Sequence, residues 1–178
     1  MMAVQDFNSF ANPTVDTKHF KIYANVSTTT TAEYELQGRG VTSWTDTQNI
    51  DTNSEEDVLG YVDFTFSKPK STQDADIKVR KGSKLGMMLF DAYFKGDGKI
   101  ENIDILQKYE MVDASDSDSD NCKARLQKGC AIVINEFTGE AGGKLTFSVT
   151  FNYTGEITTG KMAKIDPSTI AFTADSAE

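Results

Sequence analysis

The segment of residues 144–154 constrains the fold most, because its apolar and polar residues alternate without a break. Side chains along a β-strand point to opposite faces at every second residue. One face of this segment is therefore apolar, and it consists of Leu145, Phe147, Val149, Phe151 and Tyr153. We expect a long strand of an antiparallel sheet, with Leu145, Phe147, Val149 and Phe151 in the core and a solvated opposite face.

Strand-like patterns recur along most of the chain. They predict strands at 20–26, 34–36, 41–47, 58–66, 76–81, 103–112, 124–127 and 131–137. Gly139, Gly142 and Gly143 separate the last of these from the 144–154 strand, as expected for the turn of a hairpin.

Residues 83–95 have the period of a helix instead. Ser83 is a good N-cap residue, and Gly96 is suited to end a helix. The apolar positions fall on one helical face, with Leu85, Met88, Leu89 and Tyr93 as the expected core contacts together with Ala92. The predicted fold is mainly β: an antiparallel β-sandwich or partly open barrel with one flanking α-helix.

The expected domain organisation is simple. A single domain is predicted for 19–164, because both ends of the chain are polar and weakly patterned. Residues 1–18 and 165–178 are expected to be flexible arms.

Composition excludes several function classes. The 178 residues include 18 basic and 27 acidic side chains, a net charge of −9, which disfavours general nucleic-acid binding. No apolar run is long enough to span a membrane. His19 is the single histidine, and the spacing of Cys122 and Cys130 matches no zinc or CxxC motif. We expect no cofactor, no metal and two reduced thiols, although the spacing leaves a disulfide open.

Charge changes sign between two neighbouring segments. Residues 40–67 contain no Lys or Arg, and their acidic side chains are Asp46, Asp51, Glu55, Glu56, Asp57 and Asp63. Residues 68–84 are rich in basic side chains, namely Lys68, Lys70, Lys78, Arg80, Lys81 and Lys84. Ordinary solvated surface explains this pattern, as do two poles that attract each other when copies associate. Residues 45–57 are polar without periodicity, so we expect a long functional loop.

The acidic run at residues 113–120 has the opening rhythm of a calcium loop, with Asp116, Asp118 and Asp120. Asn121 and Gln127 then stand where such a loop requires glycine and glutamate. We therefore expect a solvated acidic loop between strands. No pair of carboxylates stands out as catalytic, so the chain is not expected to be an enzyme.

Three segments resemble a known family. They are residues 36–44 (LQGRGVTSW) with the acidic segment after them, 81–94 (KGSKLGMMLFDAYF) and 131–147 (AIVINEFTGEAGGKLTF). In this order they resemble an early strand with its stacking loop, the central helix and the last hairpin of tail tube proteins of long-tailed bacteriophages. The non-contractile, siphovirus-like members are most similar. The acidic run at 113–120 is not typical of that family.

The resemblance implies a structural protein of the virion, assembled in the host cytoplasm. Members form stacked hexameric rings whose strands join into a hollow tube, through which double-stranded DNA passes without specific binding. The implied partners are further copies of the chain, the tape-measure protein, and the tail terminator and distal tail proteins, with no membrane.

Two hypotheses concern function. In the first, the segment carrying Asp46, Asp51, Glu55, Glu56 and Asp57 reaches the next ring, where it meets Lys78, Arg80, Lys81 and Lys84. The alternative is a soluble β-sandwich that binds carbohydrate, with Trp44 as a sugar platform. A hydrolase with paired carboxylates is a third interpretation.

Overall fold

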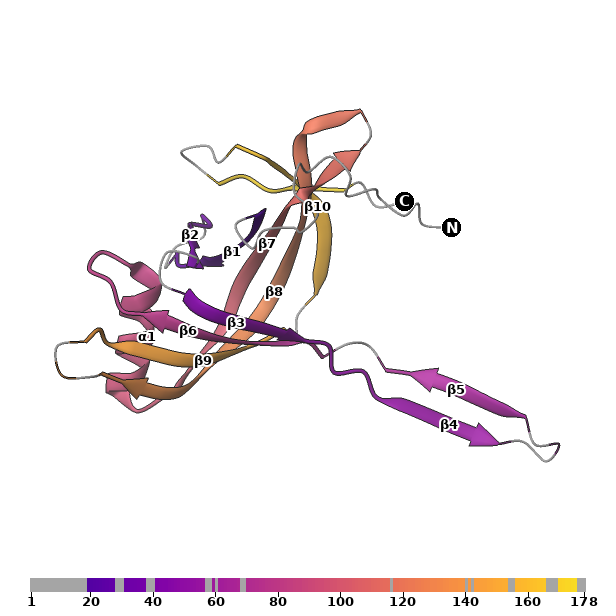
Figure 1. Cartoon of the computed structure of the whole chain (residues 1–178), viewed down its shortest axis with the longest axis horizontal. Helices are drawn as coiled ribbons and strands as arrows, with labels where there is room; N and C mark the ends of the chain where they lie inside the picture. The colour runs from indigo at the N-terminus through magenta and orange to yellow at the C-terminus, as the bar shows by residue number, and fades with distance from the viewer. Residues whose placement is uncertain are drawn as a thin grey trace.

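The computed structural model describes residues 19–27, 31–37, 41–56, 59, 61–67, 70–115, 117–139, 141, 143–153, 156–165 and 170–175. Side chains are described for these residues except 41–44. The strands in chain order are β1 Phe20–Asn25, β2 Tyr34–Leu36, β3 Val41–Thr47, β4 Thr52–Glu56, β5 Val62–Phe66, β6 Thr72–Lys78, β7 Lys99–Ser115, β8 Asp118–Thr138, β9 Thr146–Asn152, β10 Ile157–Ala163 and β11 Thr173–Ala174. The helix α1 spans Lys84–Lys95, between β6 and β7 (Figure 1).

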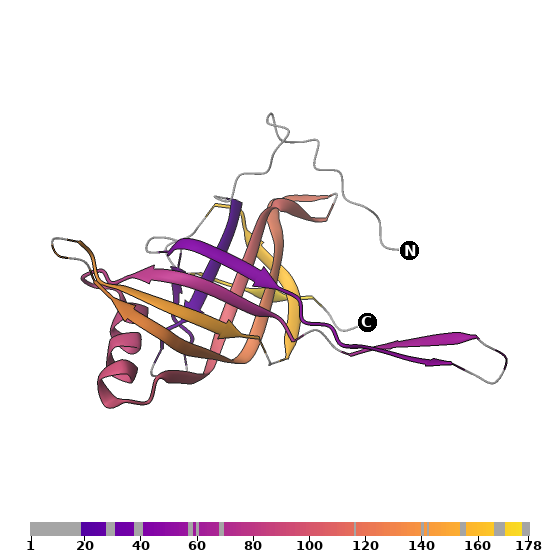
Figure 2. The same cartoon turned by 60° about the horizontal axis from the view of Figure 1, so that its bottom comes forward.

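Most strands form one antiparallel sheet in the order β2-β1-β7-β8-β9-β6-β3. The long strand β8 has two partners on one side, β9 along its second half and β10 along its first half. β11 pairs with β10, and β4 pairs with β5 in a separate two-stranded ribbon. Figure 2 shows the sheet curving around the core, with α1 beside one end. The predicted class, mainly β and antiparallel with one flanking helix, is confirmed for the described residues.

β8 joins two segments that the sequence analysis predicted as separate strands, 124–127 and 131–137. A bulge between them explains the error, because Gly129 has a φ of 65° and adds one residue against β7. The extra residue breaks the alternation of side chains, so the pattern looks interrupted where the strand continues. The Gly129 amide donates to Asp104 Oδ1 at 3.2 Å, which fixes the bulge.

The core has two parts. The larger cluster lies between the sheet and α1 and contains Ile22, Ile105, Ile132 and Phe147 among others. The smaller cluster surrounds Cys122 and Met162, where β7, β8 and β10 meet. Each cysteine belongs to a different cluster, and both are free and buried. Eight residues of one strand, about 26 Å, separate them, so no disulfide can join them.

The alternation that defined the last long strand is confirmed for three of its four predicted core residues. Phe147, Val149 and Phe151 on β9 are fully buried. Leu145 is 49% exposed, so its assignment to the core was wrong. The reason is its position in the chain, because β9 begins at Thr146 and Leu145 lies in the connection before the strand.

The helix begins and ends as the sequence predicts. The Ser83 hydroxyl accepts a hydrogen bond from the Gly86 amide at 3.0 Å, and Gly96 adopts the left-handed conformation. Leu85 and Leu89 are buried, and Met88 packs partly buried against them. Tyr93 is 48% exposed and lies at the rim of the core, so its core assignment was wrong. Its ring contacts Phe137 at a centroid distance of 4.9 Å.

Three further expectations need correction. Residues 45–57 do not form one long loop, because β3 ends at Thr47 and β4 occupies Thr52–Glu56. The strand predicted at 76–81 begins and ends earlier in the chain, since β6 spans Thr72–Lys78. No sequence pattern predicted β10. Its Gly160 allows close approach of Phe172, since a Cβ at this position would overlap the Phe172 ring.

The two ends of the chain differ in what is described. Residues 1–18, expected as an N-terminal arm, lie outside the described residues. Part of the expected C-terminal arm forms β11, and Ile170 and Phe172 pack against the smaller core cluster.

Candidate assembly surfaces

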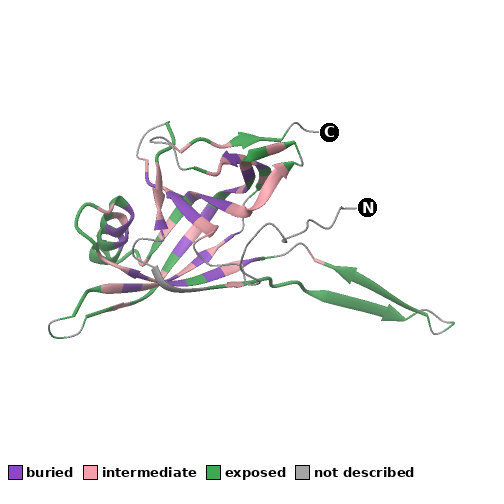
Figure 3. Cartoon of the chain, turned by 45° about the horizontal axis from the view of Figure 1, so that its top comes forward, coloured by how far each residue is buried: buried purple, intermediate pink, exposed green. Residues whose placement is uncertain are grey.

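A β-hairpin of β4 and β5 projects from one end of the molecule (Figure 1). Every residue of both strands is exposed, and Figure 3 shows the ribbon without a layer against either face. Backbone hydrogen bonds hold its base: Ser67 donates to the Asp51 carbonyl at 2.9 Å, and Lys70 donates to the Asn49 carbonyl at 3.0 Å. An isolated two-stranded ribbon is only marginally stable in water, so a contact with another molecule would stabilise this hairpin.

The two faces of the hairpin differ in chemistry. Directly paired residues lie on the same face, and the pairs Thr52–Phe66, Ser54–Phe64 and Glu56–Val62 define one of them. The pairs Asn53–Thr65 and Glu55–Asp63 define the other, which is polar and acidic. The first face therefore carries an apolar stripe of Val62, Phe64 and Phe66, which we call the hairpin stripe. The alternating pattern predicted a strand at 58–66 that includes these side chains, and the structure places them in solvent on β5.

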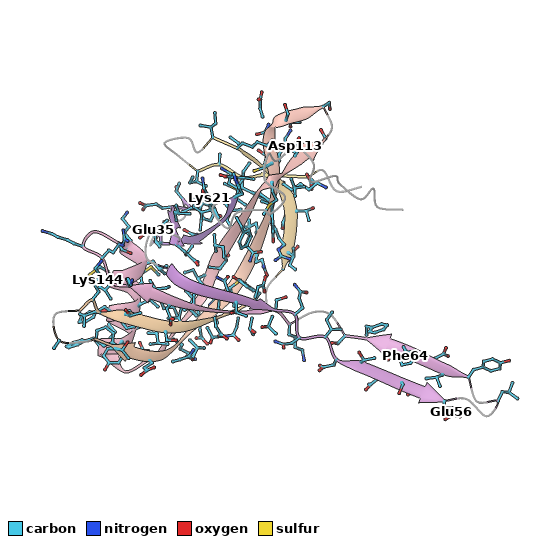
Figure 4. All side chains as sticks on the ribbon, viewed as in Figure 1. Lys21, Glu35, Glu56, Phe64, Asp113 and Lys144 are labelled. Atoms are coloured by element: carbon cyan, nitrogen blue, oxygen red, sulfur yellow. The ribbon has the colours of Figure 1, made fainter. Side chains whose placement is uncertain are left out.

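The predicted basic residues gather at the opposite end of the molecule. β6 begins beside the base of the hairpin and ends at Lys78, followed by Arg80, Lys81 and Lys84. In Figures 1 and 2 the hairpin and α1 lie at opposite ends of the long axis. Figure 4 labels Glu56 and Phe64 at one end and Lys144 at the other. Lys84 pairs with Glu33 at 2.5 Å.

The predicted acidic residues are only partly brought together. Asp51 lies at the base of the hairpin, and Glu55 and Glu56 lie on β4. Asp46 lies apart from them on β3, opposite Gln73, with one carboxylate oxygen buried. Asp57 and the side chain of Trp44 fall outside the described residues. The hairpin acids thus form one group that excludes Asp46.

An exposed aromatic surface covers the outer side of α1. Met87, Phe90 and Phe94 follow one another at spacings of three and four residues, so they share one helical face. Phe90 stacks on Phe94 at a centroid distance of 6.2 Å and meets Phe137 edge-on at 6.4 Å. Phe94 is 80% exposed. We call these three residues the helix stripe. The helical period of the apolar residues predicted only the buried face of α1, so the helix stripe was not predicted.

Polar side chains fill part of the interior between β6, β7, β8 and β9. Gln107 Oε1 accepts from Arg125 Nε at 2.8 Å and from Gln127 Nε2 at 3.1 Å. The Tyr153 hydroxyl donates to Gln73 Oε1, and burial raises the pKa of that phenol far above its ordinary value, with the Asp46 charge adding to the shift. These hydrogen bonds favour one relative position of the strands, because a shift would separate donors from acceptors and leave buried polar groups without partners.

The acidic run of residues 113–120 was expected as a loop, but β7 extends to Ser115 and β8 begins at Asp118, so most of the run lies in the paired ends of these two strands. Lys161 and the Asn121 amide hydrogen-bond to the Asp118 carboxylate, at 2.7 and 2.8 Å, and hold its pKa below the ordinary value. Asp113 pairs with Lys164. Asp116 lies outside the described residues. These partners tie the carboxylates into the β7–β8 end, and the part of the chain that is described contains no cluster of three or more metal-ligating side chains.

The arrangement defines a class of fold: a curved antiparallel sheet with one flanking helix and a long projecting hairpin. No protein-family model matches the chain, and no curated protein matches it in sequence. The solved structures that it resembles include the SPP1 tail tube, with a TM-score of 0.57, 13% identity, and coverage of 86% of this chain and 81% of that chain.

Two further solved structures have the same fold. The tail of an empty gene transfer agent particle, with C6 symmetry, matches at a TM-score of 0.54 and 12% identity, covering 81% of this chain and 97% of that chain. A sheath–tube complex of an extracellular contractile injection system matches at 0.50 and 11% identity, covering 88% and 98%. The chain therefore has the fold of tail tube proteins. Among the described residues, no helix has the length and apolar character needed to cross a membrane.

Proposed function

We propose that this chain is a structural subunit of a phage-like tail tube, without enzymatic activity. Copies associate into rings of six, and the rings stack into a hollow tube that conducts double-stranded DNA into the host. The tail of the virion is its location, after assembly in the host cytoplasm. Its partners are other copies of itself, the tape-measure protein, and the terminator and distal tail proteins.

The observation that carries this proposal is the exposed hairpin at one end of a tail-tube fold. The hairpin has no layer against either face, whereas the strands of the main sheet have a packed core. A tube needs contacts between successive rings, and a projecting ribbon supplies one. The related architecture of the SPP1 tail tube supports the assignment at the level of fold.

Two further features support assembly in rings. Within the described part of the chain, β2 and β3 are the ends of the sheet order, so each has an edge that another copy can pair with. The C6 symmetry of the similar gene transfer agent tail supports a ring of six. Six copies at −9 each carry about −54, which repels DNA phosphates and favours passage without binding.

The proposed contact between rings joins opposite charges. Asp51, Glu55, Glu56 and Asp57 belong to the hairpin segment, and Lys78, Arg80, Lys81 and Lys84 belong to the other end of the molecule. A head-to-tail stack brings these two groups next to each other. Asp46, from the same acidic segment, lies apart on β3 and is left out of this contact.

Charge reversal tests the proposed stacking contact. Glu55→Lys, Glu56→Lys and Asp57→Lys together should leave the subunit folded but stop tube growth, since like charges then face each other. The matched variant adds Lys78→Glu, Arg80→Glu and Lys81→Glu to the same chain and should restore growth. Tube length by electron microscopy and subunit folding by circular dichroism are the measurements. Normal tubes from the first variant, or no recovery in the second, contradict the assigned contact.

A further inference from the structure

Two exposed apolar stripes lie at opposite ends of the molecule. The hairpin stripe is exposed along its length, with Phe64 at 61% and Phe66 at 69%. The helix stripe is exposed at Met87 and Phe94, and Phe90 forms its centre. Contiguous exposed aromatic side chains of this kind mark interaction sites in soluble proteins.

The two stripes match in length. Val62 and Phe66 are four steps apart along an extended strand, about 13 Å. Met87 and Phe94 are seven steps apart along a helix, about 10 Å. One stripe can therefore lie along the other, with three side chains contributed from each.

The segments that carry the two stripes differ in charge. Glu56 lies on the same face of the hairpin as the hairpin stripe, Glu55 and Asp63 lie on the opposite face, and residues 40–67 contain no basic side chain. Arg80, Lys81 and Lys84 lie at the start of the helix. A contact between two hairpin stripes would bring together two hairpins that carry only acidic charges, and like charges in apposition are disfavoured. The basic start of α1 therefore favours the helix stripe as the partner of the hairpin stripe.

Geometry requires that this partner belong to another copy. β6 separates the base of the hairpin from the start of α1, and the two stripes lie at opposite ends of one molecule (Figures 1 and 4). When two different patches of identical subunits form a contact, the resulting assembly still has one unoccupied patch of each kind. Further copies can therefore add to it, and the assembly grows.

We infer that the hairpin stripe of one copy packs on the helix stripe of the next copy, and that this apolar contact holds successive subunits of the assembly together. The inference rests on the proposed tube function and adds a specific partner surface to it. The acidic charge of the hairpin and the basic charge at the start of α1 orient the two stripes, whereas the aromatic side chains supply most of the binding energy, as in the centre of other interfaces.

Two blocked variants test this contact in the full chain. The hairpin variant carries Phe64→Glu and Phe66→Glu, and the helix variant carries Met87→Glu and Phe94→Glu. Each should associate at least about 30-fold more weakly than wild type, because it lacks one of the two stripes. The matched control carries Asn53→Glu and Thr65→Glu, the same added charge on the polar face of the same hairpin, and should assemble as wild type does.

Mixing the two blocked variants gives the sharper result. The helix variant still has an intact hairpin stripe, and the hairpin variant still has an intact helix stripe. Their mixture should therefore associate by one step, to twice the mass of the starting unit in analytical ultracentrifugation, and then stop. Circular dichroism of each variant verifies folding, which exposed positions should leave intact.

The outcomes separate this inference from the proposed function. Wild-type assembly with no loss in either blocked variant overturns the stripe contact and leaves the tube function standing. Loss in both variants without association of the mixture also overturns it, in favour of another pairing of surfaces. A wild-type protein that does not self-associate at any concentration overturns both proposals.

Discussion

The Ser83 hydroxyl donates a hydrogen bond to the Glu35 carboxylate at 2.7 Å, which joins the start of α1 to β2. The same carboxylate accepts from the Lys84 and Leu85 amides at 2.7 and 3.0 Å. These amides are among those that a helix leaves without intrahelical partners, and the negative charge also suits the positive end of the helix dipole. Glu35 thus fixes the position of α1, which carries the helix stripe.

Replacing Glu35 by glutamine should lower the free energy of unfolding by about 1–3 kcal/mol, because charge-assisted hydrogen bonds to the helix start are lost. Glu33→Gln is the control, since its pair with Lys84 is largely exposed and should contribute less than about 1 kcal/mol. Urea denaturation measures both. Equal effects of the two substitutions would refute the assigned role of Glu35.

Phe147→Ala should destabilise the fold by about 3–5 kcal/mol, since the ring is fully buried and stacks on Phe137 at 4.5 Å. Leu145→Ala, two residues earlier on the same sequence pattern, should cost less than about 1 kcal/mol because Leu145 is half exposed. Thermal and urea unfolding of the two variants compare them. A large effect at Leu145 would place it in the core after all.

Tyr153 should make the fold sensitive to alkali. Burial raises the pKa of its phenol in the folded state above the value of 10.0 expected when unfolded. The folded state then keeps a proton that the unfolded state loses, so stability is intact below pH 10 and falls as pH rises above it. The slope contributed is up to about 1.4 kcal/mol per pH unit.

Tyr153→Phe removes this contribution, although it also leaves Gln73 without its donor and lowers stability at neutral pH by about 1–3 kcal/mol. Urea unfolding between pH 8 and pH 11 should give a shallower alkaline slope for the variant than for wild type. Identical slopes would show that Tyr153 ionises in the folded state as it does in water.

Both cysteines should be free thiols that react slowly in the folded protein. Burial raises the pKa of the Cys122 thiol, so little of the reactive thiolate exists near pH 8. Titration with a thiol reagent under non-reducing conditions should give slow reaction in buffer and two thiols per chain in denaturant. No reactive thiol in denaturant would reveal a disulfide that the separation along β8 excludes.

Sequence patterns predicted the elements whose buried face is covered by the same chain. Phe147, Val149 and Phe151 alternate because their strand packs on its own core, and Leu85 and Leu89 recur at the helical period for the same reason. Val62, Phe64 and Phe66 alternate just as clearly, but they lie in solvent. Alternation identifies an apolar face, and it does not show whether the same chain buries that face.

Other features left no signal in local sequence. The bulge at Gly129 interrupts the alternating pattern, so one long strand was predicted as two. β10 lacks apolar alternation because it contains Gly160 and neighbouring threonines in place of large apolar side chains. The charge reversal between neighbouring segments predicts two poles, and this stays a prediction. The distance between the hairpin and the start of α1 depends on β6 running between them, which only the fold reveals, whereas Lys70 of the basic segment lies at the hairpin base beside Asp51.

Electron microscopy of the purified protein at increasing concentration, with light scattering on the same samples, tests the central claim most directly. The account predicts hollow tubes of stacked rings whose length grows with concentration, because each added copy presents a free hairpin at one end. Particles that stay monomeric at every concentration would contradict it.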